Sequence, residues 1–157
     1  MDQPYADEWW AKHCTWGEFR RQGIKIRTAT FSHRDNKANV VLATGWGDSV
    51  LKYSDIIQHL YSRGFNVFTY DHQSQGLSGR WLLNHQTIYV ENFEDYVDDF
   101  VYFVTTVVQV DSDSLQNNNN GNPDSPSSQS SGGGGGRKPT YCLGCSMGGL
   151  IASIAMS

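Results

Sequence analysis

A short segment around residue 146 constrains the fold more than any other part of the sequence. Residues 140–144 are predicted to form a strand, which runs directly into Gly-Cys-Ser-Met-Gly-Gly and then into a helix of small residues over Met147 to Ser157. In a G-x-S-x-G pattern placed between a strand and a helix, the serine occupies a strained turn. Side chains at 144 and 148 would clash with the adjoining helix and strand, so glycine is expected at both positions. The segment therefore predicts a strand–turn–helix unit.

The remaining sequence alternates between strand-like and helix-like segments. Ile24 to Phe31 alternates in β-prone residues, and Thr15 to Arg20 is its expected hairpin partner across the turn at 21–23. Two further strands are predicted over Val40–Thr44 and Phe65–Tyr70, with a helix over Tyr53–Arg63 between them. Ser54 is expected to cap that helix and Gly64 to end it. This alternation predicts the α/β class, with a mostly parallel sheet and helices on its faces.

A second, longer helix is predicted to begin after Asn92, which serves as its cap. Glu94 and Asp95 lie in the first turn, where the positive end of the helix favours carboxylates. Its apolar face is expected to comprise Phe93, Tyr96, Val97, Phe100, Val104 and Val107. The polar stretch from Asp71 to about Glu91 is predicted to be a loop.

The stretch from Asp111 to Pro139 is rich in Ser, Asn and Gly and contains almost no apolar residues. Such a composition buries too little surface to offset the entropy of ordering, so disorder is predicted. The sequence thus divides into the N-terminal part of a domain (1–110), a low-complexity insert (111–139), and the strand and helix around Ser146 (140–157).

Composition excludes several classes of function. The chain has 12 basic and 16 acidic residues, and its basic residues do not cluster beyond Arg20-Arg21, so no nucleic-acid partner is expected. Its N-terminus lacks the pattern of a secretory signal, and no apolar run approaches the roughly 18 residues of a spanning helix. Three cysteines (Cys14, Cys142 and Cys145) suggest no disulfide framework. We expect a cytoplasmic protein without a metal or cofactor; a redox or metal role for the Cys142–Cys145 pair is the minor alternative.

Ser146 is the candidate nucleophile. The predicted turn would lift its hydroxyl to the carboxyl end of the sheet, where the backbone N–H of Met147 can stabilise an oxyanion. A second donor should come from the loop after an earlier strand, and the N–H of Trp46 in Gly45-Trp46-Gly47 is the candidate. Each assignment has an alternative: Ser146 is an incidental serine in a Gly-rich turn, and Trp46 is an aromatic residue that packs on the surface beside a pair of turn glycines.

These residues resemble the monoglyceride lipase and bacterial lysophospholipase branch of the α/β-hydrolases, which is also classed with serine aminopeptidases. Asp71-His72-Gln73-Ser74-Gln75-Gly76-Leu77-Ser78-Gly79-Arg80 is similar to the family's D-H-x-G-x-G-x-S-x-G/R stretch. The helix start at 93–99 is similar to F-x-D-Y-V-x-D, and GCSMGG is similar to the family's G-H-S-M-G-G. The resemblance implies an α/β-hydrolase fold and extends over nearly all of the chain outside the insert.

The sequence departs from the family pattern in three ways. Cys145 stands where the family has His, and Ser74 stands where it has Gly. The family's triad order is Ser, then Asp or Glu, then His, so both partners and the cap that shapes the acyl pocket are expected beyond residue 157. His72 follows a strand end; it either lies on the catalytic edge or is a packed or solvated loop histidine. Asp71 is expected to hold its own loop through backbone N–H groups.

The resemblance implies a serine ester hydrolase acting on a monoacylated lipid, either a lysophospholipid or a monoacylglycerol, with possible peripheral membrane contact through the cap. Ser146 would form an acyl-enzyme, and the N–H groups of Trp46 and Met147 would hold the oxyanion. Two alternatives remain: a peptidase of the same superfamily, and a catalytically incomplete fragment. By itself, the 157-residue chain is expected to be inactive and poorly folded.

Overall fold

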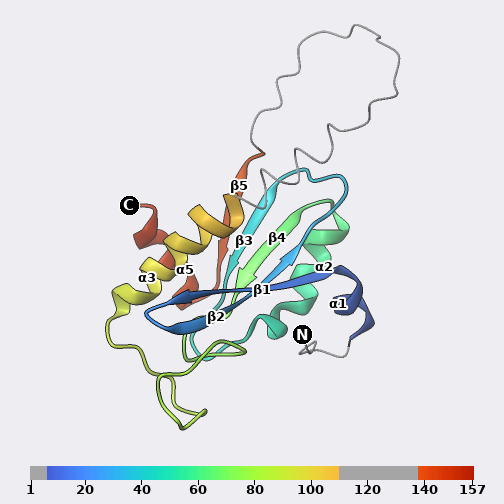
Figure 1. Ribbon diagram of the computed structural model, residues 1–157. Coiled ribbons are helices and arrows are strands. Elements are labelled where there is room, and N and C mark those ends of the chain that lie inside the picture. The colour runs from blue at the N-terminus through green and yellow to red at the C-terminus, as the bar shows by residue number, and fades with distance from the viewer. Residues whose placement is uncertain (1–6, 110–137) are drawn as a thin grey trace, which may run out of the picture.

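The computed structural model describes residues 7–109 and 138–157, which form a five-stranded sheet with helices on both faces (Figure 1). The strands are β1 (Cys14–Arg21), β2 (Ile24–Phe31), β3 (Asn39–Ala43), β4 (Asn66–Tyr70) and β5 (Thr140–Gly144). Their order across the sheet is β1-β2-β4-β3-β5. Strands β4, β3 and β5 are parallel to one another, whereas β1 and β2 form an antiparallel hairpin. The predicted strands and the α/β class are therefore confirmed.

The parallel strands β3 and β4 are buried along their whole length, because both faces of the sheet are covered. One face carries α1 (Glu8–His13), the 3-10 turn η1 (Val50–Tyr53) and α2 (Ser54–Ser62). The opposite face carries α3 (Phe93–Tyr102), the π-helical turns η2 (Phe103–Val108) and α5 (Met147–Ala155) (Figure 1). Within the described ranges, no helix is long and apolar enough to cross a membrane.

Three local features differ from the prediction. The short helix α1 was not predicted; Asp7 caps it, and Trp10 anchors it in the core at 1% exposure. Ser54 does not cap α2, because η1 runs directly into that helix and the Ser54 N–H bonds to the carbonyl of Leu51. The Ser54 hydroxyl instead accepts a hydrogen bond from Trp10 Nε1 at 2.8 Å.

The end of the long helix also differs from the expected regular helix. After Tyr102 the backbone adopts π-helical turns, which are wider than α-helical ones and change which side chains face the sheet. Phe103 and Val108 are therefore fully buried, whereas Val104 and Val107, assigned to the apolar face from the sequence, are only partly buried. The predicted start of this helix is correct: Asn92 is the N-cap, and its N–H donates to Asp95 Oδ2 at 3.1 Å.

Strand β5 pairs with β3, and within residues 7–109 and 138–157 nothing pairs with its other edge. Tyr141 and Leu143 on this strand are exposed, as are three apolar residues along α5 and just after it: Leu150, Ile154 and Met156. The β5 edge of the sheet is therefore open in this part of the chain and has an apolar surface beside it. The expected disorder of the insert over 111–139 concerns residues that lie almost entirely outside the described part of the chain.

Candidate active site

Ser146 lies in the turn between β5 and α5, where it is the N-cap residue of the helix. Its backbone has φ 51° and ψ −119°, a conformation that non-glycine residues rarely adopt and that costs about 1–3 kcal/mol. The turn is held on both sides, since the Cys145 N–H donates to Ala43 O at 3.0 Å and the Gly148 N–H donates to Cys145 O at 2.9 Å. The residue itself is exposed. The surrounding structure thus keeps Ser146 in a strained, accessible position.

Two glycines allow this turn to pack tightly against its neighbours. A Cβ atom on Gly148 would lie 2.3 Å from the backbone oxygen of Ala43, the last residue of β3. On Gly144 it would lie 2.4 Å from the Cα of Gly149 in α5. Both contacts are far below van der Waals distance and both involve backbone atoms, which cannot rotate away. Any side chain at either position would therefore push α5 away from the sheet.

The loop that follows β3 lies beside this turn at the carboxyl edge of the sheet. A Cβ on Gly45 would lie 3.4 Å from the carbonyl oxygen of Cys145, which places the start of the Gly45-Trp46-Gly47 segment next to the serine turn. Trp46 is 53% exposed, and its ring packs edge-on against Tyr96 with centroids 6.3 Å apart. Among the described residues, neither the Trp46 N–H nor the Met147 N–H has a hydrogen-bond acceptor. One of these amides lies in the loop after β3 and the other at the start of α5.

The Asp71 carboxylate joins two loops. As expected, it holds its own loop, accepting from the Leu77 N–H at 2.6 Å. It also accepts from the Val50 N–H at 2.7 Å and thereby binds the end of the loop that follows β3. Burial raises the pKa of Asp71 to about 6, although these backbone hydrogen bonds act in the opposite direction. Asp71 is fully buried, and its carboxylate is used to hold these two loops together.

His72 is a packed histidine and is not exposed at the catalytic edge of the sheet. Its side chain is fully buried between the rings of Tyr70 and Tyr96, with ring centroids 5.0 and 5.3 Å away. Burial lowers its pKa to about 4, so the ring is neutral at neutral pH. Nε2 lies 3.1 Å from the carbonyl oxygen of Thr44, and a neutral ring donates its proton there. His72 therefore supports the end of β3 and is not available as a base for Ser146.

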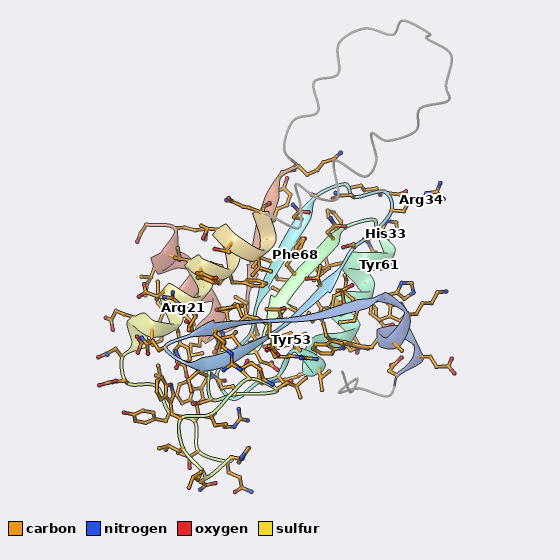
Figure 2. All side chains as sticks on the ribbon, in the orientation of Figure 1. Arg21, His33, Arg34, Tyr53, Tyr61 and Phe68 are labelled. Carbon is orange, nitrogen blue, oxygen red and sulfur yellow. The ribbon has the colours of Figure 1, made fainter. Side chains whose placement is uncertain are left out.

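The cysteines are unpaired: Cys14 and Cys142 are partly buried and Cys145 is exposed. Within the described residues, no group of three His, Cys, Asp or Glu side chains is arranged to hold a metal ion. The Cys145 thiol lies beside the Tyr53 hydroxyl (Tyr53 is labelled in Figure 2). Burial raises the pKa of Tyr53, and its hydrogen bonds to Asp48 and Cys145 raise it further, which keeps this hydroxyl protonated.

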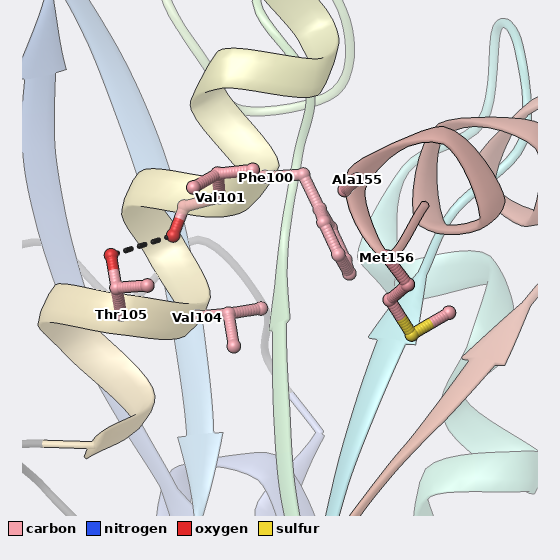
Figure 3. Close-up of a pocket in the computed structure, with 6 residues that line it drawn as sticks. All are labelled: Phe100, Val101, Val104, Thr105, Ala155 and Met156. Atoms are coloured by element: carbon pink, nitrogen blue, oxygen red, sulfur yellow. Dashed lines mark hydrogen bonds between the residues drawn. The ribbon is translucent and has the colours of Figure 1, made fainter.

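A small apolar pocket of about 110 Å³ lies between the long helix and the C-terminal end of α5. Figure 3 shows its lining residues, which are Phe100, Val101, Val104, Thr105, Ala155 and Met156. Ser146 lies at the opposite end of α5, so this pocket is separate from the serine turn.

Ser74 stands where the family that this sequence resembles has glycine. The structure shows why a serine is unfavourable at this position. Its φ is 61°, its side chain is 1% exposed, and its hydroxyl has no hydrogen-bond partner among the described residues. A left-handed backbone costs a non-glycine residue about 1–2 kcal/mol, and an unpaired buried hydroxyl costs about 1–3 kcal/mol. Both costs are absent in a glycine.

We therefore expect Ser74→Gly to raise the free energy of unfolding by about 1–2 kcal/mol, after subtracting the extra entropy of glycine in the unfolded chain. The midpoint of denaturant unfolding of the full-length protein measures the effect. Ser153→Gly is the matched control, because Ser153 lies inside α5 and the same substitution should destabilise a helix by about 0.5–1 kcal/mol. Equal destabilisation by both variants would show that Ser74 carries no strain.

Comparison with known proteins identifies the family and agrees with the fold. The profile of the family described as serine aminopeptidase, S33, matches residues 34–157. Lysophospholipase L2 of Escherichia coli K12 is 36% identical over 86 residues, which is 55% of this chain and 25% of that protein. A soluble variant of monoglyceride lipase from Saccharomyces cerevisiae superposes with a TM-score of 0.63 at 17% identity, over 94% of this chain and 40% of that chain. A thermostable carboxyl esterase from Bacillus coagulans gives 0.64 at 16% identity, over 91% and 39%.

The chain thus spans about a quarter of the length of its curated relative and about two fifths of the solved structures. The structural neighbours, all at low identity, establish the fold. The family match covers well over half of the sequence, and it includes the loop after β3 and the serine turn. The chain belongs to the serine aminopeptidase S33 family of the α/β-hydrolases.

Proposed function

We propose that the full-length protein is a serine ester hydrolase that cleaves monoacylated lipids, either lysophospholipids or monoacylglycerols, through an acyl-enzyme at Ser146. The observation that carries the proposal is the strained, exposed Ser146 at the start of α5, near two backbone N–H groups that have no acceptor in the described part of the chain. A hydroxyl at a helix N-terminus next to such donors suits attack on a carbonyl carbon, because negative charge develops on the carbonyl oxygen. The lipid substrate is supported by the names of the similar lysophospholipase and monoglyceride lipase.

In the proposed reaction, Ser146 Oγ forms a bond to the acyl carbon and gives its proton to a base. The N–H groups of Trp46 and Met147 donate hydrogen bonds to the resulting oxyanion. Collapse of the tetrahedral intermediate expels the glycerol-containing alcohol, which takes up the proton, and water then hydrolyses the acyl-enzyme. His72 is not placed to act as this base, since it is buried and bonded to Thr44. We propose that the base is a histidine of the full-length protein other than His72.

A peptidase of the same superfamily is the second candidate, and the family's description as serine aminopeptidase favours it. The test compares initial rates of the full-length protein on lysophosphatidylcholine, monooleoylglycerol and aminoacyl p-nitroanilides. We expect kcat/KM for at least one of the two lipid esters to exceed kcat/KM for every anilide by at least about 100-fold. Preference for an anilide would favour the peptidase, and the absence of turnover on every substrate would favour a catalytically incomplete protein.

A further inference from the structure

The two backbone amides on either side of Trp46 are both held by side chains from other segments. The Gly45 N–H donates to the hydroxyl of Tyr53 in η1 at 3.2 Å. The Gly47 N–H donates to Oε1 of Gln75, which lies in the loop after β4. The Trp46 N–H between them has no acceptor among residues 7–109 and 138–157. The loop is thus fixed on both sides of this amide.

Both anchoring side chains are themselves immobilised. Gln75 is 2% exposed, and its Nε2 donates to the Tyr96 hydroxyl at 3.4 Å. Tyr53 is 5% exposed, and its hydroxyl donates to Asp48 Oδ2 at 2.6 Å. The other oxygen of Asp48 lies 2.6 Å from Lys52 Nζ, and this contact lowers the pKa of Asp48 and keeps it ionised as an acceptor. Gln75 therefore holds the loop from a different segment, whereas Tyr53 is held by its own burial and by Asp48 of the same loop.

This arrangement matters because a glycine on each side would otherwise leave the peptide of Trp46 free to rotate. Gly47 has φ +74°, a conformation that allows the chain to turn but does not restrain it. A donor that stabilises a developing oxyanion is effective only when its direction is fixed before the reaction, and a displacement of about 1 Å can cost about 100-fold in rate. The two hydrogen bonds supply that restraint.

We propose that Gln75 and Tyr53 are positioning residues that orient the Trp46 N–H toward the oxyanion, an inference that rests on the proposed ester hydrolysis at Ser146. In this proposal Gln75 acts through the backbone of the loop, and Tyr53 acts through that backbone and through its contact with Cys145 in the serine turn. Their loss should therefore lower kcat while leaving the affinity for the ground-state substrate almost unchanged.

The test uses four variants of the full-length protein. Gln75→Met removes the acceptor at similar length, whereas Gln75→Glu keeps a carboxyl oxygen to accept from Gly47. Tyr53→Phe removes the acceptor of the Gly45 N–H without loss of bulk. Tyr61→Phe is the matched control, because the Tyr61 hydroxyl contacts His13 at 3.0 Å near the other end of α2 (Figure 2). Each variant is measured for kcat, KM, unfolding midpoint and inhibition by an alkyl boronic acid, which forms a tetrahedral adduct with the serine.

We expect Gln75→Met and Tyr53→Phe to lower kcat by about 10- to 100-fold, with KM within about 3-fold and boronate affinity reduced in parallel with kcat. Gln75→Glu should regain most of the loss, and Tyr61→Phe should match the unsubstituted protein. Unchanged kcat in folded Gln75→Met and Tyr53→Phe, or equal losses in Gln75→Glu and Gln75→Met, would overturn the inference alone. Absence of Ser146-dependent turnover in the unsubstituted protein would overturn the proposed function and the inference with it. If Gln75→Met does not fold, Tyr53→Phe decides by the same criteria.

Discussion

Replacing Ser146 by alanine in the full-length protein is expected to lower ester hydrolysis by at least about 10⁴-fold and to abolish labelling by a fluorophosphonate probe. The alanine removes the only hydroxyl in the turn between β5 and α5, so no acyl-enzyme can form there. The residual rate should come only from the two free N–H groups and from substrate binding. Labelling followed by gel fluorescence, together with turnover of a short-chain p-nitrophenyl ester, measures both effects.

Ser153→Ala is the control for this experiment, because Ser153 is an exposed serine on the same helix and its hydroxyl donates to the Gly149 carbonyl of that helix. It should leave both labelling and turnover unchanged. Cys145 directly precedes Ser146 and is also exposed, so gel labelling alone does not distinguish the two residues. Mass spectrometry of the labelled peptide is expected to place the probe on Ser146. Undiminished labelling in the Ser146→Ala protein would mean that the nucleophile is another residue.

Gly148→Ala is expected to destabilise the protein by about 3 kcal/mol, the upper end of typical overpacking costs, and to reduce turnover of any protein that folds by about 100-fold. The new methyl group would lie 2.3 Å from the Ala43 oxygen, so α5 must move away from β3. That movement displaces Ser146, which is the first residue before the helix, relative to the loop of Trp46. Stability is measured by denaturant unfolding and activity on the same ester.

The neighbouring glycine provides a control of the same chemistry. A Cβ on Gly149 would lie 3.5 Å from the nearest atom, the Gly144 oxygen, which is an ordinary contact. Gly149→Ala should therefore change stability by less than about 1 kcal/mol, and the better helix propensity of alanine favours a gain. If the two alanine variants behave alike, the close contact of Gly148 with β3 does not determine the geometry of the serine turn.

The sequence predicted the elements that are determined by local patterns. The strands alternate or form short apolar runs, and the serine turn is marked by glycines at fixed distances, so both could be located without the structure. The helix α1 could not, because a six-residue helix shows little periodicity and depends on burial of Trp10. The π-helical turns at Phe103 were also missed, since their wider turn leaves no distinct residue pattern.

The roles of Gln75 and Tyr53 could not be predicted for a different reason. Gln75 bonds to an amide 28 residues away, and Tyr53 bonds to one 8 residues away across a loop, so both pairings exist only after the strands assemble. Gln75 stands inside the D-H-x-G-x-G-like stretch, and its place there was the one available signal. The role of His72 could not be predicted either, because a histidine after a strand fits two roles. Its burial and its hydrogen bond to the Thr44 carbonyl distinguish the packed residue from a catalytic one.

The pairing of β5 with β3 has a consequence for the order of folding. Asn39 and Thr140, the first paired residues of these strands, are 101 positions apart, whereas β1 and β2 meet across a two-residue turn. Contacts of high sequence separation form slowly, since a large loop must close before they contribute. The four earlier strands also leave the ribosome before β5, and chains begin to fold during synthesis. We expect β5 to join an already formed four-stranded sheet, so that Ser146 acquires its strained backbone in one of the last steps of assembly.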